Sequence, residues 1–282
     1  VDEAQDFNES QRELIRRCVI GGRCVIVGDK NQAIYGFRGA DTNSIGLFYE
    51  SLTTSDRKIS EFPLSISWRC PNHVVSEANR FVKDFRAHEN AINGAVVVNA
   101  PFNPQEGDMV LCRFNAPIIG AFYELISQGK SAYILGRDMT KGLTMAIDKI
   151  TRNGEMGTEE FWELFMTDFN INSQRLLAEN KNSQAIALED EKDCIAIFVR
   201  KATTVAGIKM AIDELFNNAE KGEIMLSTVH KAKGLEADNV YILATEKMPH
   251  PMGGQEENNI AYVAITRAKN NLFYCGPKPQ LN

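Results

Sequence analysis

Three patterns are missing from this sequence of 282 residues. It has no C-x-x-C pair, no metal-ligand spacing among its four histidines, and no apolar run long enough to cross a bilayer. The six cysteines are scattered and most lie in apolar runs, which favours reduced, buried thiols over disulfides or zinc ligands. We therefore expect a cytoplasmic protein with no membrane partner.

A general excess of positive charge is missing too. The formal net charge is −6, which argues against a basic protein that coats nucleic acid. It leaves open an enzyme that holds one strand in a narrow, locally basic channel. With 44% apolar and 24% charged residues, the composition is that of a globular protein, and the length allows two domains.

The most informative stretch is residues 25–40, VIVGDKNQAIYGFRGA. Residues 24–27 form an apolar run that predicts a buried strand, and Gly28 and Asp29 end it. Polar groups at the carboxyl end of such a strand bind ligands in open α/β sheets, and Gln32 offers an amide there. Chemistry suited to stacking bases and holding phosphates follows in three side chains: Tyr35, Phe37 and Arg38. The alternative is two core aromatics beside a surface charge.

The first six residues, VDEAQD, form a second informative segment. A strand end followed by Asp-Glu is a Walker B pattern, in which Asp2 would hold Mg²⁺ and Glu3 would activate the attacking water. Two adjacent acids that are simply solvated are the alternative, but the spacing to residues 25–40 favours the Walker B interpretation.

Five segments occur in the order of the second to sixth motifs of superfamily 1 DNA helicases, and the chain resembles the UvrD/Rep type of that family. They are VDEAQD at 1–6, the stretch at 25–40, SWRCP at 67–71, STVHKAKGLE at 227–236 and NIAYVAITRAK at 259–269. Five ordered motifs with matching spacing are hard to obtain by chance.

The resemblance implies roles for further residues. For the phosphates of ATP it implies that Gln32 senses the γ-phosphate, that Arg69 contacts the γ-phosphate and that Arg267 is a cis arginine finger. For the rest of the nucleotide it implies that Trp68 stacks on the base, that Gly234 allows close backbone approach and that Glu236 contacts the ribose. For the DNA backbone it implies contacts from Thr228 and His230. Alternatives remain open for four residues: Trp68 could be a core tryptophan, and Lys231 and Lys233 could be solvated or bind phosphate. Arg137 could contact phosphate or pair with Asp138.

The implied fold class is α/β, with tandem RecA-like parallel-sheet domains of the P-loop NTPase type. We expect a truncated first domain at residues 1–88 and a second at 89–282, with a small helical insertion at about 139–218. The sequence pattern predicts strands at 64–68, 109–112, 132–135, 224–226, 240–244 and 272–275. It predicts helices at 10–18, 41–52, 71–85 and 115–129.

The expected function is that of an ATP-dependent DNA helicase that uses ATP and Mg²⁺ to move 3′ to 5′ on single-stranded DNA and at duplex junctions. No G-x-x-x-x-G-K-[ST] sequence occurs. We therefore expect a fragment, inactive when isolated, of a longer protein whose N-terminal part carries the Walker A loop. Two alternatives remain: a non-catalytic DNA-binding or regulatory remnant, and a helicase–nuclease relative.

Overall fold

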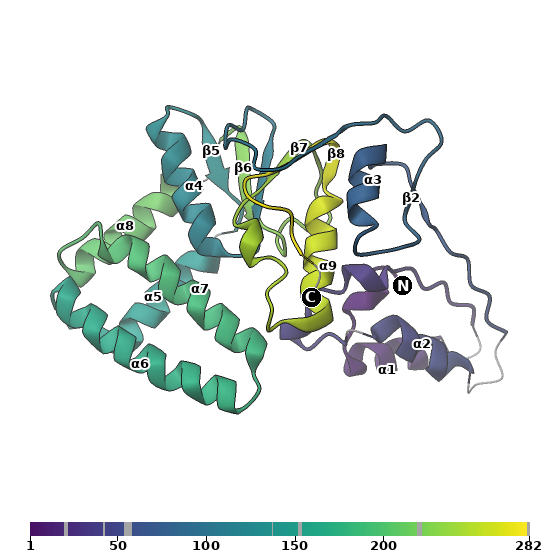
Figure 1. The fold of residues 1–282 in the computed structure, drawn as a ribbon. Coiled ribbons are helices and arrows are strands. Elements are labelled where there is room, and N and C mark those ends of the chain that lie inside the picture. Colours follow the sequence, from purple (N-terminus) through teal and green to yellow (C-terminus); the bar gives the residue numbers. More distant parts are fainter. Residues whose placement is uncertain are drawn as a thin grey trace.

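A six-stranded parallel sheet is the centre of the computed structural model, which describes residues 1–19, 22–41, 43–53, 58–136, 138–151, 154–218 and 222–280 (Figure 1). The strand order is β3-β8-β7-β4-β6-β5, and every pair is parallel. The strands are β3 (Ala95–Val97), β4 (Met109–Cys112), β5 (Ala132–Ile134), β6 (Ile224–Thr228), β7 (Ala237–Ile242) and β8 (Ala268–Tyr274). This α/β class is the one expected for a RecA-like domain.

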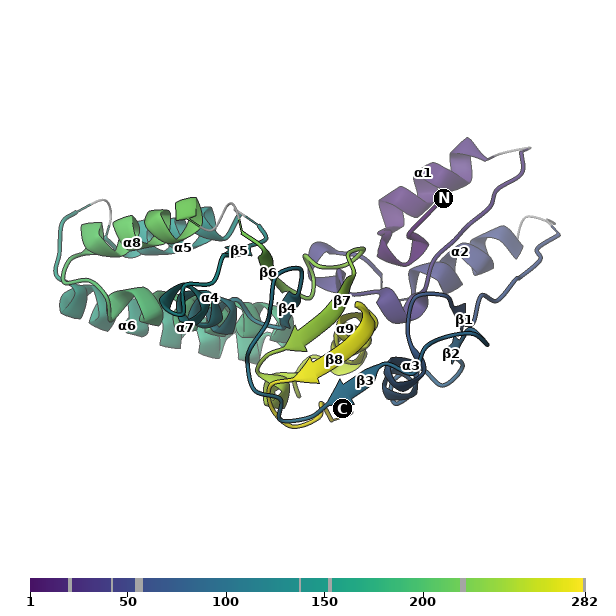
Figure 2. The same cartoon turned by 90° about the horizontal axis from the view of Figure 1, so that it is seen from above.

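Both faces of this sheet are covered, which explains why β4 and β5 are continuous apolar runs. Within β4, Val110 faces one core together with α4 (Asn115–Ser127), whereas Leu111 faces a second core with α9 (Gly254–Ile265). Figure 2 shows helices on either side of the sheet. The five strands expected from residue 109 onward and the helix at 115–129 are confirmed, but the edge strand β3 was missed.

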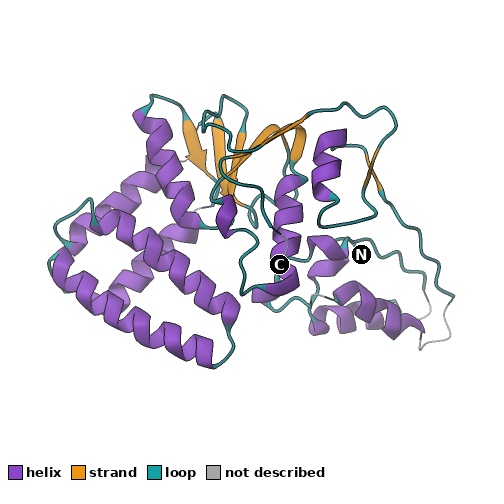
Figure 3. Ribbon diagram, in the orientation of Figure 1, coloured by secondary structure: helices purple, strands orange, loops and turns teal. Residues whose placement is uncertain are grey.

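Four helices form the part of the chain between β5 and β6, as expected for residues 139–218. They are α5 (Asp138–Thr151), α6 (Thr158–Ala178), α7 (Asn182–Val199) and α8 (Val205–Asn218). Buried aromatic side chains, among them Phe161 and Phe198, join these helices to the core around α4. In Figure 3 they stand apart from the strands as a separate helical layer. Arg137 and the side chain of Asp138 lie outside the described residues.

The leading part of the chain is built from short elements. These are η1 (Ala4–Asp6), α1 (Glu9–Cys18), η2 (Lys30–Gln32), η3 (Gly36–Arg38), α2 (Ser44–Thr53), β1 (Ile66–Ser67), α3 (Asn72–Ala78) and β2 (Arg86–Ala87). The helices expected at 10–18 and 41–52 are confirmed. None of the residues of α1 is buried.

The prediction of a buried strand at 24–27 was wrong. This segment is extended but belongs to no strand, and Val25 is 74% exposed. Its backbone pairs with the first residues, through Val27 N–H to Val1 O at 2.9 Å and Ala4 N–H to Val27 O at 3.0 Å. Among the described residues no strand flanks it on the other side, so its apolar side chains face solvent.

The half-buried strand expected at 64–68 was also wrong. Only β1 forms, paired in parallel with β2, and the apolar side that alternation placed inward is open to solvent. Leu64 is 90% exposed and Trp68 is 79% exposed, whereas Ser67 between them is buried. Trp68 is therefore not a core tryptophan.

The helix expected at 71–85 ends early, because α3 stops at Ala78. Its buried residues Val74, Val75 and Ala78 pack in the same core as α9 and β8, although they precede the expected domain boundary at residue 88. By packing, α3 belongs with the six-stranded sheet, and the domain division itself stays a prediction. No helix among the described residues has the length and apolarity to span a bilayer.

Candidate functional site

The carboxylate of Asp29 organises the segment that follows residues 24–28. Its Oδ1 accepts the N–H of Asn31 at 2.9 Å, and its Oδ2 accepts the side-chain amide of Gln32 at 3.0 Å. From α9, the hydroxyl of Tyr262 donates to the same Oδ2 at 3.5 Å. The Gln32 amide is thus held beside a carboxylate that also contacts helix α9.

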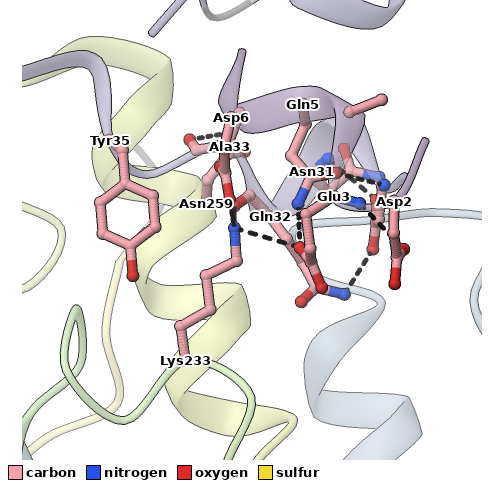
Figure 4. A network of polar contacts seen from close by, with 12 residues as sticks. Asp2, Glu3, Gln5, Asp6, Asn31, Gln32, Ala33, Tyr35, Lys233 and Asn259 are labelled. Atoms are coloured by element: carbon pink, nitrogen blue, oxygen red, sulfur yellow. Dashed lines mark hydrogen bonds and ion pairs between the residues drawn. The ribbon is translucent and has the colours of Figure 1, made fainter. Parts of the chain in front are cut away.

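The acidic pair at the start of the chain is ordered by its neighbours. The Oδ1 of Asp2 accepts the N–H of Glu3 at 2.8 Å, and Glu3 has a left-handed backbone with φ of 51°. The buried Gln5 donates its amide to the Glu3 carboxylate and accepts the N–H of Asp29 at 3.0 Å (Figure 4). These bonds tie the VDEAQD segment to the Asp29 segment, and both acids remain exposed.

Lys233, from the loop after β6, reaches across to the leading part. Its Nζ lies 2.6 Å from Asp6 Oδ2, 2.8 Å from the carbonyl oxygen of Gln32 and 3.6 Å from Glu3 Oε2. The lysine side chain is only 7% exposed, so it is an ion-pair partner and is not solvated. Burial raises the pKa of the Asp6 carboxyl, and the Lys233 charge opposes that rise.

Two side chains of α9 hold the backbone of residues 30–36. Asn259 donates its amide to the carbonyl oxygens of Ala33 at 3.0 Å and Lys30 at 3.3 Å. The carboxylate of Glu256 accepts the N–H of Gly36 at 2.9 Å, and burial raises the pKa of that carboxyl. The loop that carries Tyr35 is therefore positioned by helix α9.

An aromatic cluster forms where this loop meets the end of β6. The rings of Phe37 and His230 lie edge to face at 5.4 Å, and Tyr35 lies 6.1 Å from Phe37. The Tyr35 hydroxyl donates to the His230 carbonyl oxygen at 3.0 Å. Phe37 is 55% exposed, so it is not a core aromatic. Three of the predicted DNA-contacting residues are thus brought together from segments 195 residues apart.

The other two predicted DNA-contacting residues are less informative. Thr228 ends β6 and is buried, and its carbonyl oxygen accepts the N–H groups of Lys231 and Ala232. The backbone of Arg38 closes η3, and its side chain is outside the described part of the structure.

The two predicted phosphate-contacting arginines lie close enough for their charges to interact. Arg69 approaches Glu236 at 3.6 Å, and its Nε is buried with no hydrogen-bond partner among the described residues. Arg267 is 1% exposed and donates to the carbonyl oxygens of Val263 at 2.9 Å and Leu235 at 3.1 Å. Burial, and after it the Arg69 charge, lowers the pKa of Arg267 to about 10.

Two predicted nucleotide-contacting residues lie outside these networks. Gly234 has φ of 86° with open space where a Cβ would stand, so this glycine serves backbone conformation. Trp68 packs on the ring of His88. Within the described residues no three His, Cys, Asp or Glu side chains cluster as a metal site, and Mg²⁺ binding by Asp2 stays a prediction.

Two family models match the chain. The UvrD-like helicase C-terminal domain matches residues 121–275, more than half of the chain, and the UvrD/REP helicase N-terminal domain matches residues 1–53. The chain belongs to the UvrD-like helicase family. The family resemblance seen in the motifs is thereby confirmed, and the α/β fold is that of its RecA-like domains.

Relatives of this UvrD-like helicase include F-box DNA helicase protein 1 of Schizosaccharomyces pombe, 29% identical over 96% of this chain and 33% of the relative. A probable DNA helicase II homolog of Mycoplasma genitalium is 33% identical over 33% of this chain and 13% of the relative. DNA helicase II of Rickettsia typhi is 23% identical over 97% of this chain and 59% of the relative. The chain thus spans only part of each relative.

Sequence reasoning missed the residues that join the two parts of this UvrD-like helicase. Gln5, Glu256 and Asn259 were assigned no role, and Lys233 was expected to be solvated or to bind phosphate. One signal was available, since Asn259 directly precedes the apolar run 260–265 and a polar residue there needs a partner. Its partners, backbone carbonyls more than 220 residues away, could not be read from the sequence.

Proposed function

We propose that this UvrD-like helicase segment is part of an ATP-driven motor that moves 3′ to 5′ along single-stranded DNA and opens duplex junctions. The observation that carries the proposal is the cluster of Tyr35, Phe37 and His230. A half-exposed ring beside an imidazole offers a stacking face for a base, and base stacking needs no particular sequence.

The same loop supports coupling between DNA and nucleotide. Phe37 lies five residues after Gln32 in the sequence, and Gln32 shares the Asp29 carboxylate with Tyr262 of α9. A movement of the Gln32 amide is therefore transmitted along one short backbone segment, which Asn259 and Glu256 hold at both ends.

The residues present fit a bound nucleotide in part. Arg69 has a buried Nε that lacks a partner in the described structure, and the nearby Arg267 adds a second positive charge. An anion at this pair would relieve the repulsion between the two guanidinium groups. Arg267 would have to exchange its bonds to Val263 and Leu235 to reach a phosphate.

We assign roles on this basis. Asp2 would hold Mg²⁺, Glu3 would orient and deprotonate water, and Gln32, Arg69 and Arg267 would contact the phosphates. Glu236 and Gly234 would border the sugar. When bound, ATP with Mg²⁺ would supply the free energy of phosphoanhydride hydrolysis. The Walker A loop would come from another part of the protein, and the thiols buried in the core suit a reducing cytoplasm.

One observation favours a second candidate, a DNA-binding module without catalysis. The Arg267 guanidinium is fully buried and bonded to protein groups, an arrangement that serves packing as well as catalysis. This candidate shares the aromatic cluster, so it predicts the same DNA binding and no hydrolysis in the longer protein.

The Phe37→Ala variant tests the DNA site. Loss of one base–aromatic contact should weaken binding of a single-stranded oligonucleotide by about 1–3 kcal/mol. Fluorescence anisotropy gives this affinity, and a melting curve on the same sample gives stability. Because Phe37 is half-exposed, the melting temperature should stay nearly unchanged.

Two controls accompany it. Phe37→Tyr keeps an aromatic face and should keep most of the affinity, whereas Phe62→Ala removes an exposed ring from outside the cluster and should leave it unchanged. A lowered melting temperature with unaltered DNA affinity would end the stacking assignment.

A further inference from the structure

The indole of Trp68 lies against the imidazole of His88. The ring centroids are 3.6 Å apart and the planes are inclined by 30°, which is close to stacking. Trp68 is nevertheless 79% exposed, so His88 covers one side of the indole and most of the remaining surface is open.

The β1–β2 pairing fixes the position of this imidazole. Ser67 pairs with Ala87, and the N–H of His88 donates to the carbonyl oxygen of Ser67 at 3.0 Å. The N–H of Asn90 donates to His88 Nδ1 at 3.2 Å. The ring is therefore held by its own strand and by the loop that follows it.

The same loop is tied to the helix that follows Trp68. The N–H groups of Asn72 and His73, at the start of α3, donate to the carbonyl oxygens of Ile92 and Asn93, both at 2.9 Å. The Asn72 amide also donates to the carbonyl oxygen of Ala91 at 3.1 Å. The backbone that carries Trp68 and His88 is therefore held by the β1–β2 pairing and by the hydrogen bonds between the start of α3 and the loop after His88.

We propose that His88 is a positioning residue that holds Trp68 as a platform for the nucleobase of ATP. This inference rests on the proposed function and takes Trp68 to be the base-stacking side chain, as the family resemblance implies. An exposed indole with no support samples several rotamers, and binding a base would have to freeze them. Because His88 packs on one face of Trp68, the indole is already restricted before the base binds. The other face of the indole remains open to the ligand.

The charge next to Trp68 favours a nucleotide as the occupant. Arg69 follows directly in the sequence, and its buried Nε has no partner in the described residues. A flat apolar face beside a guanidinium that has an unsatisfied N–H group matches a base that carries phosphates. Stacking alone reads no base edge, so the platform accepts the base without selecting it.

Tryptophan fluorescence of the full chain tests the proposal. Trp68 and Trp162 are the two tryptophans in the sequence, so Trp162→Phe leaves Trp68 as the single reporter. ATP, added without DNA, should quench its emission saturably. In that background His88→Ala should weaken ATP binding about threefold to tenfold, the range that one aromatic pair supplies. It should also raise quenching of Trp68 by acrylamide.

His88→Phe should restore ATP affinity to within about twofold, because it keeps a flat ring under the indole. His73→Ala, which removes a different imidazole bonded to the same loop through Gly94, should leave the affinity unchanged. Circular dichroism and melting curves check that every variant is folded.

Three results would overturn the proposal. One is unchanged ATP affinity in His88→Ala while Trp68→Ala loses affinity. Another is no quenching by ATP in the parent chain. A third is quenching by a single-stranded oligonucleotide that ATP does not compete with. None of these results changes the outcome of the Phe37 test, which measures DNA affinity. Failure of the Trp68 platform can therefore be distinguished from failure of the proposed DNA motor.

Discussion

Leu64 and Leu111 were both predicted in strands, and they end in opposite environments. Leu111 is central in the six-stranded sheet and is fully buried, whereas Leu64 in the leading part is 90% exposed. β4 has a parallel partner on each side, but β1 pairs only with β2. An apolar strand pattern therefore predicts extended backbone, and burial depends on which strands flank it.

The sheet region and the leading part of the chain also differ in the contacts that stabilise them. The sheet region has two apolar cores, one on each face. The leading part shares one of these cores through Ile34 and the buried residues of α3, and it also meets the sheet region through polar and charged contacts, such as Lys233 with Asp6 and Asn259 with Ala33. Glu3 and Gln32, which are assigned to ATP, lie at this polar junction, where a small movement costs less than it would within a packed core.

The largest difference should come from truncating the two leucines. Leu111→Ala is expected to lower the free energy of unfolding by about 2–5 kcal/mol, because it leaves a cavity in a packed core. Leu64→Ala removes the same atoms from an exposed site and should change it by less than about 0.5 kcal/mol. Urea unfolding followed by circular dichroism measures both, and equal losses would mean that Leu64 is buried in solution.

This contrast shows how much of the fold the sequence could predict. Strands β4 and β5 were located to within a residue, because a buried parallel strand is a short apolar run between turn residues. β3, with the sequence AVV, is as short as β5 but was missed because it follows a polar stretch. The exposure of Val25 was missed because it depends on partner strands and not on its own segment.

The site was predicted unevenly for a related reason. Motif spacing indicated Gln32, Tyr35, Phe37 and His230, and the structure brings the last three together. Nothing in the spacing indicated that Lys233 would enter the acidic segment. Pairing of side chains across 227 residues is a property of the tertiary fold, and one sequence alone does not contain it.

The next largest effect is expected at the junction. Lys233→Met removes the cation from a buried ion pair and leaves Asp6 without its partner, which should cost about 3 kcal/mol locally. Because α1 and α2 contribute no side chain to either apolar core, the loss should appear there first. Hydrogen exchange should speed up in α1 and α2 and stay unchanged in β4 and β6.

Lys269→Met is the matched control. Lys269 forms ion pairs with Asp238 at 3.3 Å and Glu236 at 4.0 Å but is 40% exposed, so its loss should cost no more than about 1 kcal/mol. Uniform acceleration of exchange across both parts in Lys233→Met would show that the two do not open separately.

The smallest effect is expected at a polar joint inside the sheet region. Asp190 of α7 accepts the N–H groups of Asn115, at 2.9 Å, and Ala116, at 3.1 Å, which begin α4. It thereby caps a helix whose own N-cap residue, Phe114, has no side-chain acceptor. Asp190→Ala should cost about 1 kcal/mol, well below Leu111→Ala, and chemical denaturation of the two variants compares them directly.

The pH dependence of this joint has a definite sign. Burial raises the pKa of the Asp190 carboxyl above its usual value, and the N–H groups of Asn115 and Ala116 oppose that rise. Between the unfolded pKa of about 4 and the higher folded pKa, the native chain binds more protons than the unfolded chain. The carboxyl therefore favours folding most at or below about pH 4, and this contribution falls as pH rises through that window. Asp190→Asn removes the titration. The melting temperature of the variant minus that of the parent should therefore increase as pH rises from about 4 to 7. A constant difference between the two across this range would show that the carboxyl titrates alike in the folded and unfolded chain.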